Sequence, residues 1–365
     1  MTRLGRTALY GAVAGLALVT AADRGFALEP GDFGQTLTGA TIGAAIAVPP
    51  PPGLYAVIDG FGAPLGRGTG QNLGTTVAVP LIGPTLFWST GLHILGANLS
   101  MAVVQPVYWT AAFPTTGATL GGNPSGPPYG GAIWFETTAN TLITPVLLQW
   151  KLGDGLFAAA GITLIPPDGS RYNGTLNPDY FSYEPRWSLA YKSLDWHLTA
   201  NFKYDVNTAS AGHTGSYQIA ANLPFPLGFG GTPLAPTIAG IGHGYRSGQE
   251  AFLDLAATKV FGKWEIGPVA SFKWQTTADR PGGGFTCAQL AAALPAGLGC
   301  GRATNYSVGG LLGYDLGVAD FQVWATDSVY NRDDFKGWGV YSRVSFPLWS
   351  AQPAAPAKPM LAKAN

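Results

Sequence analysis

The stretch Tyr180–Asn207, YFSYEPRWSLAYKSLDWHLTANFKYDVN, contains two strand-length segments in which apolar and polar residues alternate. In the first segment Trp187 and Leu189 share the apolar face, whereas Glu184 lies on the polar face. Successive side chains of a strand point to opposite sides, so each segment predicts a strand with one apolar and one charged surface. A soluble sandwich and a lipid-facing barrel both produce this alternation. The rest of the chain must decide between them.

The N-terminus has the layout of a secretory signal. Arg3 and Arg6 are basic, and an apolar run follows at residues 7–21. This run is shorter than the roughly twenty apolar residues that a membrane-spanning helix needs. We therefore expect residues 1–27 to be a signal peptide, with cleavage after Ala22 or after Ala27 both open.

The composition favours an exported membrane protein. Only 11% of the residues are charged, and 12% are aromatic, whereas soluble domains carry about 25% charged residues. After the signal, no stretch of sequence is long and apolar enough to be a spanning helix. A closed barrel is the other structure that satisfies every backbone group in lipid. This indicates the bacterial outer membrane, and the net charge of zero with no basic stripe argues against nucleic acid as a partner.

Tight turns and long loops alternate along the chain. The tight turns are expected at Leu95-Gly96, Gly153-Asp154-Gly155, Ser193, Phe261-Gly262-Lys263 and near Gly317. The long loops are expected at 64–84, 110–138, 166–179, 207–248, 278–302 and 327–336. Outer-membrane barrels have short turns at one end, long loops at the other and an even strand number. We therefore predict an all-β, antiparallel, up-and-down transmembrane barrel of about twelve strands.

Two features leave the strand number between ten and fourteen. The segment Leu54–Phe61 alternates poorly, and Thr141–Lys151 contains Pro145, which cannot donate to a ladder. Losing this pair would give ten strands, and strands hidden inside 207–248 would give fourteen.

The regions on either side of the barrel differ in composition from it. The barrel itself is expected at 54–349, and its last strand ends at Trp349. Residues 350–365 are rich in Ala and Pro, which predicts a disordered tail. Residues 28–53 include four consecutive prolines at 49–52, which predicts a stiff extended segment. That segment could fold into the lumen as a plug or remain a periplasmic leader.

The polar faces of the predicted strands carry charges of both signs. Opposite charges on neighbouring strands can pair, and together they would line the lumen and set its selectivity. The mixture of signs argues against a pore for ions of a single sign. The alternative is a structural ladder that fills a narrow barrel. The candidate lumen residues are Glu184, Arg186, His197, Lys203, Asp205, Asp254, Glu265, Lys273 and Arg343.

Two of the predicted long loops are aromatic and almost uncharged. Between 110 and 138 the one charged residue is Glu136, and 223–229 has none. Apolar loops above a polar outer surface suggest a capture surface for hydrophobic molecules. Packing of the loops on one another as a lid is the other explanation. The candidate capture residues are Trp109, Phe113, Trp134, Phe135, Phe225 and Phe229.

Catalysis, metals and cofactors are not expected. Cys287 and Cys300 are the two cysteines, and in an exported chain they are most simply a disulfide within one loop. Neither a histidine nor a second cysteine pair is near them in sequence, so metal binding is a poor alternative. A membrane-embedded hydrolase would need a serine next to a histidine, and no nucleophile-elbow motif occurs.

Several short motifs in the same order resemble a known family. They include GLFAAAGITLIPPDGS at 155–170, YFSYEPR at 180–186, NFKYDVNT at 201–208, SGQE at 247–250 and PLW at 347–349. Over roughly residues 53–349 the chain resembles the outer-membrane proteins of the phenol-degradation MetA-pathway family. The resemblance implies passage of aromatic or other hydrophobic compounds across the outer membrane. The Ala/Pro tail and the uncharged 110–138 loop depart from the family pattern.

Together these features predict a monomeric outer-membrane channel for passive uptake of small hydrophobic, aromatic compounds. Its partners would be those solutes, membrane lipid and lipopolysaccharide. The alternative is a closed-lumen barrel with a structural or surface-binding role.

Overall fold

The computed structural model describes residues 34–62, 64–65, 75–78, 80–114, 133–169, 177–211, 244–284, 286–289, 300–332, 334 and 336–351. Within 64–78, 108–114 and 133–137 only the backbone is described. The expected signal peptide and nearly all of the expected tail lie outside these residues. No helix in the described part of the chain is long and apolar enough to cross a membrane.

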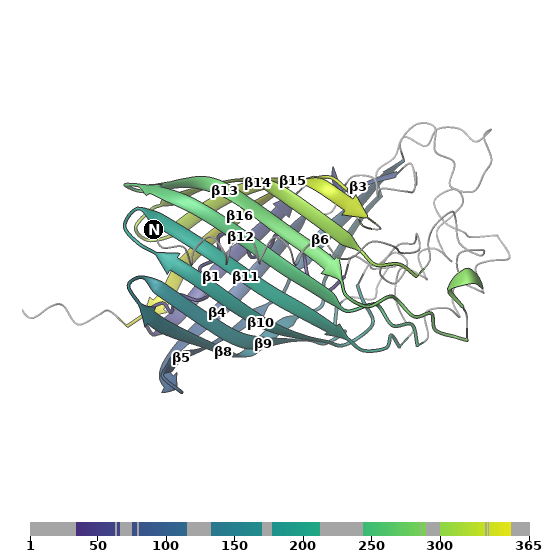
Figure 1. The fold of residues 1–365 in the computed structure, drawn as a ribbon, viewed down its shortest axis with the longest axis horizontal. Helices are drawn as coiled ribbons and strands as arrows, with labels where there is room; N and C mark the ends of the chain where they lie inside the picture. Colours follow the sequence, from purple (N-terminus) through teal and green to yellow (C-terminus); the bar gives the residue numbers. More distant parts are fainter. Residues whose placement is uncertain are drawn as a thin grey trace, which may run out of the picture.

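The described strands form one antiparallel sheet that closes into a ring of twelve strands (Figure 1). Closure occurs at β1, which pairs with β16 on one side and with β4 on the other. The predicted barrel is therefore confirmed. The ring strands are β1 (Gly53–Gly62), β4 (Leu81–Ile94), β5 (Ala97–Val104), β8 (Leu142–Gly153), β9 (Leu156–Ile165), β10 (Ser182–Lys192), β11 (Trp196–Asn207), β12 (Glu250–Phe261), β13 (Trp264–Gln275), β14 (Thr304–Asp315), β15 (Asp320–Arg332) and β16 (Trp338–Ser350).

Four further strands continue the sheet beyond the ring. They are β2 (Pro64–Leu65), β3 (Thr75–Ala78), β6 (Val107–Pro114) and β7 (Ile133–Thr138). Their presence corrects the expectation of loops over all of 64–84 and 110–138. The reason is that β3 pairs with β6 and β6 with β7, so backbone hydrogen bonds continue past the ring.

Both weakly patterned strands are present in the ring. The segment at 54–61 forms most of β1, and the segment at 141–151 forms most of β8. The register of β8 against β9 shifts between Ile143 and Val146. Pro145 lies in this irregularity, where its missing N–H breaks no regular pair.

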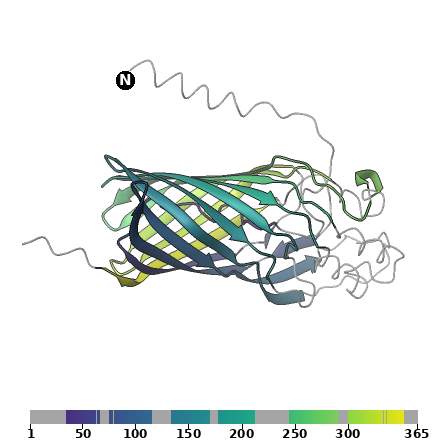
Figure 2. The ribbon, with the colours of Figure 1, turned by 90° about the horizontal axis from the view of Figure 1, so that it is seen from below.

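The two ends of the barrel differ, as Figure 2 shows. At the end that we call the turn end, the strands are joined by tight turns. One contains Leu95 and Gly96, with φ of 52° and 75°, and another contains Asp154 with φ of 46°. At the opposite end, the loop end, the long connections emerge. This is the arrangement of a bacterial outer-membrane barrel.

Alternation along each strand separates an outer apolar surface from an inner polar one. On β10 the outward Trp187 and Leu189 are 49% and 55% exposed, whereas the inward Ser188 is 5% exposed. Rings also meet on the outer surface near the turn end, where Trp264 and Tyr314 have centroids 4.5 Å apart. The apolar outer surface therefore faces lipid, and the chain lies in the outer membrane.

Candidate functional site

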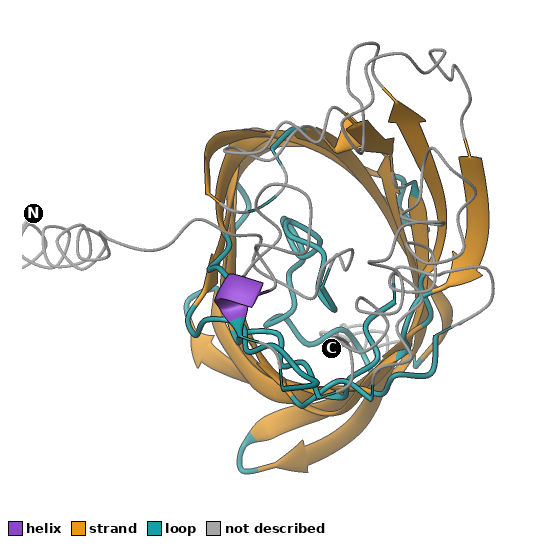
Figure 3. Cartoon of the chain, turned by 90° about the vertical axis from the view of Figure 1, so that its right-hand side faces the viewer, coloured by secondary structure: helices purple, strands orange, loops and turns teal. Residues whose placement is uncertain are grey.

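Residues 34–52, which we call the threaded segment, run inside the barrel from the loop end to the turn end. At the loop end the Gln35 side chain donates to the Tyr180 carbonyl over 2.8 Å. At the turn end the Ser89 hydroxyl donates to the Pro50 carbonyl over 3.1 Å, and the Ala351 N–H donates to the Pro52 carbonyl over 2.8 Å. In the view along the barrel axis, this coil crosses the interior of the ring (Figure 3).

Side chains of the barrel wall hydrogen-bond to the main chain of the threaded segment. Arg343 donates to the Ala40 and Ile42 carbonyls over 2.6 and 2.9 Å. Asn201 donates to the Thr41 carbonyl over 2.7 Å and also to the Ala44 carbonyl. An irregular backbone buried inside a barrel needs such partners, because an unpaired buried carbonyl is costly. Three further wall residues donate to segment carbonyls: Gln149 to Ile46, Trp324 to Gly39 and Tyr341 to Thr38.

Two wall carboxylates bind threonines of the threaded segment. The Thr36 hydroxyl donates to Glu184 Oε2 over 2.6 Å. Asp254 Oδ2 accepts from both the hydroxyl and the N–H of Thr41, over 2.6 and 3.0 Å. These bonds attach the segment to β10 and β12. Charge-assisted hydrogen bonds of this kind are stronger than neutral ones.

Apolar contacts hold the same segment at two heights. Ile42 is fully buried in a cluster that includes Leu311 and Trp324. Ala47 packs in a second cluster with Leu147 and Ala159. The segment therefore fills part of the lumen as packed protein rather than crossing it loosely.

The charged residues of the wall gather on β10 to β13. Arg186 pairs with Glu184 on the same strand. Lys273 Nζ is 3.0 Å from Glu250 Oε1 and 3.4 Å from Asp334 Oδ2. Because charges of both signs are present and most of them are paired, this wall does not produce an electrostatic field of a single sign.

Three cations lie at one level across these four strands, on β10, β11 and β13. Arg186 lies directly opposite Lys203, and Phe252 lies opposite both Lys203 and Lys273. The ammonium groups of the two lysines are 5.4 and 5.9 Å from the centroid of the buried Phe252 ring. Acidic residues flank this row, with Glu184, Asp205 and Glu250 on one side and Asp254 on the other.

A second polar group lies closer to the turn end. His197 Nδ1 is 2.8 Å from Glu265 Oε2, and Gln322 donates to the other oxygen of Glu265 over 2.6 Å. The Thr258 hydroxyl donates to the His197 carbonyl over 3.2 Å. This arrangement fixes the histidine ring against the wall.

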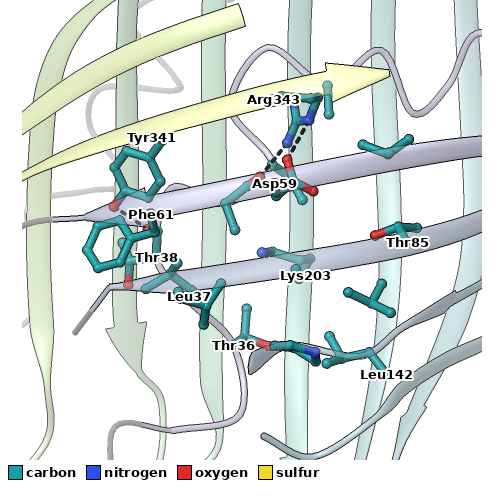
Figure 4. Close-up of a pocket in the computed structure, with 18 of the residues that line it drawn as sticks. Thr36, Leu37, Thr38, Asp59, Phe61, Thr85, Leu142, Lys203, Tyr341 and Arg343 are labelled. Carbon is teal, nitrogen blue, oxygen red and sulfur yellow. Dashed lines mark hydrogen bonds and ion pairs between the residues drawn. The ribbon is translucent and has the colours of Figure 1, made fainter. Parts of the chain in front are cut away.

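A cavity of about 640 Å³ lies between the threaded segment and the wall (Figure 4). Ligand sites typically have volumes of 300–1,000 Å³. The polar side of the cavity includes Arg186, Lys203 and Lys273. The opposite side of the cavity is formed by β1, β4, β5 and β8. Among the described residues that these strands present to the cavity, Asp59 is the one that is charged. The apolar residues of that side are Val57, Phe61, Leu81, Phe87, Ala102, Val104, Leu142 and Leu147.

The structure places every candidate lumen residue on the inside of the ring, in three groups. Glu184, Arg186, Lys203, Asp205, Asp254 and Lys273 belong to the charged wall. His197 and Glu265 form the group nearer the turn end. Arg343 lies on the opposite wall, where it contacts Asp59 and the threaded segment.

The candidate capture surface lies outside the described side chains. The backbones of Trp109, Phe113, Trp134 and Phe135 belong to β6 and β7. Phe225 and Phe229 lie in 212–243, which is not described. Cys287 and Cys300 form a disulfide, and the described residues contain no group of three or more His, Cys, Asp or Glu that could hold a metal.

Comparisons with known proteins agree with the architecture. A family profile described as "Putative MetA-pathway of phenol degradation" matches residues 60–344. A comparison with curated protein sequences finds no match.

One solved structure has the same fold at low identity, and two others match with lower scores. An outer-membrane channel from Pseudomonas putida F1 is similar with a TM-score of 0.58 and 10% identity, covering 83% of this chain and 98% of that one. The β domain of the Bordetella autotransporter BrkA has a TM-score of 0.41 and 9% identity, covering 82% of this chain and 100% of that one. The transport unit of the Escherichia coli autotransporter AIDA-I has a TM-score of 0.43 and 8% identity, covering 81% and 89%.

Proposed function

The chain belongs to the family of the putative MetA pathway of phenol degradation, and we propose that this outer-membrane channel passes small hydrophobic, aromatic compounds by passive diffusion. The observation that supports the proposal most is the two-sided lumen. One wall of the cavity is mostly apolar, and the other is charged and holds the threaded segment through carboxylates. The solute would move along the apolar side, between β1, β4, β5 and β8 and the segment.

The apolar wall suits a solute with an apolar body better than it suits a sugar or an ion. Burying apolar surface is favourable by about 25 cal/mol per Å², whereas a polar solute would lose water and find few hydrogen-bond partners there, such as Thr85 and Thr144. The family name points to aromatic compounds, and the P. putida relative of this fold is described as an outer-membrane channel. The family name supports aromatic solutes, and the structural match supports a channel fold.

The threaded segment favours a second function, a barrel whose lumen stays closed. Its carbonyls receive hydrogen bonds from several strands, and its apolar residues are packed. A permanently fixed segment would narrow the lumen for every solute. Single-channel recording in planar bilayers separates the two functions, because a closed barrel should show no conductance steps above those of the bare membrane.

Whole-cell uptake tests the proposed function. Cells with a lipopolysaccharide outer leaflet, lacking their own aromatic channels, would express the chain and be given a radiolabelled neutral alkylbenzene. We expect faster uptake than in cells with an empty vector. Equal uptake in both strains, with the barrel present and folded in the outer membrane, would exclude transport of this class of solute.

A further inference from the structure

We propose that Lys203 and Arg186 form a binding site in the lumen for the carboxylate of an aromatic carboxylic acid, with the ring of the acid on the apolar wall. This inference rests on the proposed function, because it assigns the head-group chemistry of a solute in the same cavity. Four observations on the described residues carry it.

The first observation is that the ammonium group of Lys203 is buried but lacks a hydrogen-bond acceptor. The residue is 4% exposed. Asp254 Oδ2 is the one described carboxylate within 4 Å of Nζ, at 3.9 Å, which is too long for a hydrogen bond. That oxygen already accepts two bonds from Thr41. A buried ammonium with three donors and no acceptor is costly unless a further partner is present.

The second observation is that another cation lies directly opposite Lys203. Arg186 faces it across the β10–β11 pair, and like charges in this position destabilise a sheet. Arg186 donates to Glu184 through Nη2, while its Nε is buried and makes no hydrogen bond within the described structure. An anion placed between the two cations would relieve their repulsion and accept from both.

The third observation is that both cations line the cavity. Arg186 and Lys203 belong to its charged side, and Figure 4 shows Lys203 among the side chains that line the cavity. The other two cations that line the cavity already have acceptors: Lys273 has two carboxylate partners, and Arg343 donates to Asp59 and to two carbonyls. Among the described residues that line the cavity, the cationic donors without an acceptor therefore lie together at Lys203 and Arg186.

The fourth observation is the apolar surface on the other side of the same cavity. Val57, Val104 and Leu142 line it, and the phenyl ring of Phe87 adds an aromatic surface. An inorganic anion would gain nothing from these side chains. A solute with a planar apolar body and one carboxylate would use both sides at once.

The chemistry of the donors selects a carboxylate over a neutral head group. A guanidinium and an ammonium bind a carboxylate through charge-assisted hydrogen bonds, which are about twice as strong as neutral ones. Replacing the carboxylate by an amide of the same shape should therefore weaken binding by about tenfold. The site would concentrate aromatic acids in the lumen without making the whole pore anion-selective.

Ligand-observed NMR titrations on the purified full-length barrel in detergent would test this inference. The probes are benzoate, benzamide, which has the same ring without the charge, and formate, which has the charge without the ring. Protein-free micelles correct for partitioning. We expect benzoate to bind about tenfold more tightly than either of the other two.

Substitutions test whether the carboxylate of benzoate binds at Lys203 and Arg186. Lys203→Met should reduce benzoate binding about tenfold, to the level of benzamide, and Lys203→Arg should retain most of it. Lys259→Met is the matched control: it removes the same charge from an exposed lysine on the outer surface, beside Trp196 and Phe261. It should leave all three affinities unchanged. Arg186→Gln should act like Lys203→Met if the methionine variant fails to fold.

Several outcomes would overturn the inference. Equal affinities for benzoate and benzamide would exclude the cationic site, and equal affinities for benzoate and formate would exclude the role of the apolar wall. Benzoate binding that survives in both Lys203→Met and Arg186→Gln would place the carboxylate elsewhere. If any of these occurs while whole cells still take up the alkylbenzene, the inference fails and the proposed function stands; if that uptake is also absent, both fail.

Discussion

Arg343 on β16 donates from Nε to Oδ1 of Asp59, its direct partner on β1, over 2.8 Å. The pair fixes the guanidinium so that its two terminal nitrogens point to the Ala40 and Ile42 carbonyls. A contact between two ring strands thereby also holds the threaded segment in the lumen.

Arg343→Gln should loosen the threaded segment. The substitution removes two charge-assisted hydrogen bonds to the segment, each worth about 1.5–3 kcal/mol. We expect larger or more frequent conductance steps in planar bilayers than the native barrel shows. Lys259→Gln on the outer surface is the control for the lost charge. A native conductance trace from a folded Arg343→Gln barrel would mean that this residue does not hold the segment.

The direction of the threaded segment can be read by labelling. Gln35 contacts Tyr180 and Asn140 at the loop end, whereas Pro52 lies beside Ala351 at the turn end. In intact cells a small membrane-impermeant thiol reagent should label Gln35→Cys much faster than Pro52→Cys. Permeabilised outer membranes serve as the control, since both sites should then react. Faster labelling of Pro52→Cys from outside would reverse the assigned direction.

The alternation of side chains between the two faces of a strand, which we call parity, explains which parts of the architecture the sequence predicts. Trp187, Leu189 and their equivalents repeat every second residue because one face of each strand contacts lipid. This repeat predicted most of the ring strands, whereas Leu54–Phe61 alternates poorly and left the strand number open. The strands β6 and β7 lie beyond the ring, so the alternation that lipid contact imposes is lost. The almost uncharged stretch at 110–138 was therefore interpreted as a loop.

The same parity assigned Glu184, Lys203 and the other candidates to the inner face, where the structure places them. It could not show which of them bind the threaded segment. Many of those bonds end on main-chain carbonyls, such as those of Ala40 and Ile42, and a carbonyl has no signature in sequence. Asn201, Gln149 and Trp324 were missed for this reason. Asp59 is a single acidic residue in an apolar segment, and it was the one feature of the sequence that could have predicted a partner for Arg343.

Two adjacent glycines on β14 should respond differently to a methyl group. A Cβ on Gly309 would lie 1.7 Å from the Ala325 carbonyl oxygen, whereas one on Gly310 would meet its nearest atom at 3.9 Å. Gly309→Ala should therefore force β14 and β15 apart and destabilise the barrel by roughly 1–3 kcal/mol. Gly310→Ala should be close to neutral. The temperature at which the barrel loses its compact electrophoretic mobility measures both, and equal temperatures would contradict the close approach of β14 and β15.

The disulfide makes both cysteines unreactive. Because Cys287 and Cys300 are bonded to each other, a maleimide should fail to label the native protein until a reductant is added. Cys300→Ser should leave one thiol at Cys287 that reacts without reductant. Labelling of the untreated native protein would show that the bond does not form in the membrane.

The most direct measurement of the central claim, that solutes move along the apolar side of the lumen, compares two neighbouring residues of β5. Val104 lines the cavity, and Val103 is 44% exposed on the outer surface. Val104→Trp should obstruct the apolar side, whereas Val103→Trp adds the same bulk towards lipid. Uptake of a radiolabelled neutral alkylbenzene by whole cells should fall towards the empty-vector rate for Val104→Trp and stay near the native rate for Val103→Trp. Equal uptake by the two folded variants would contradict the claim.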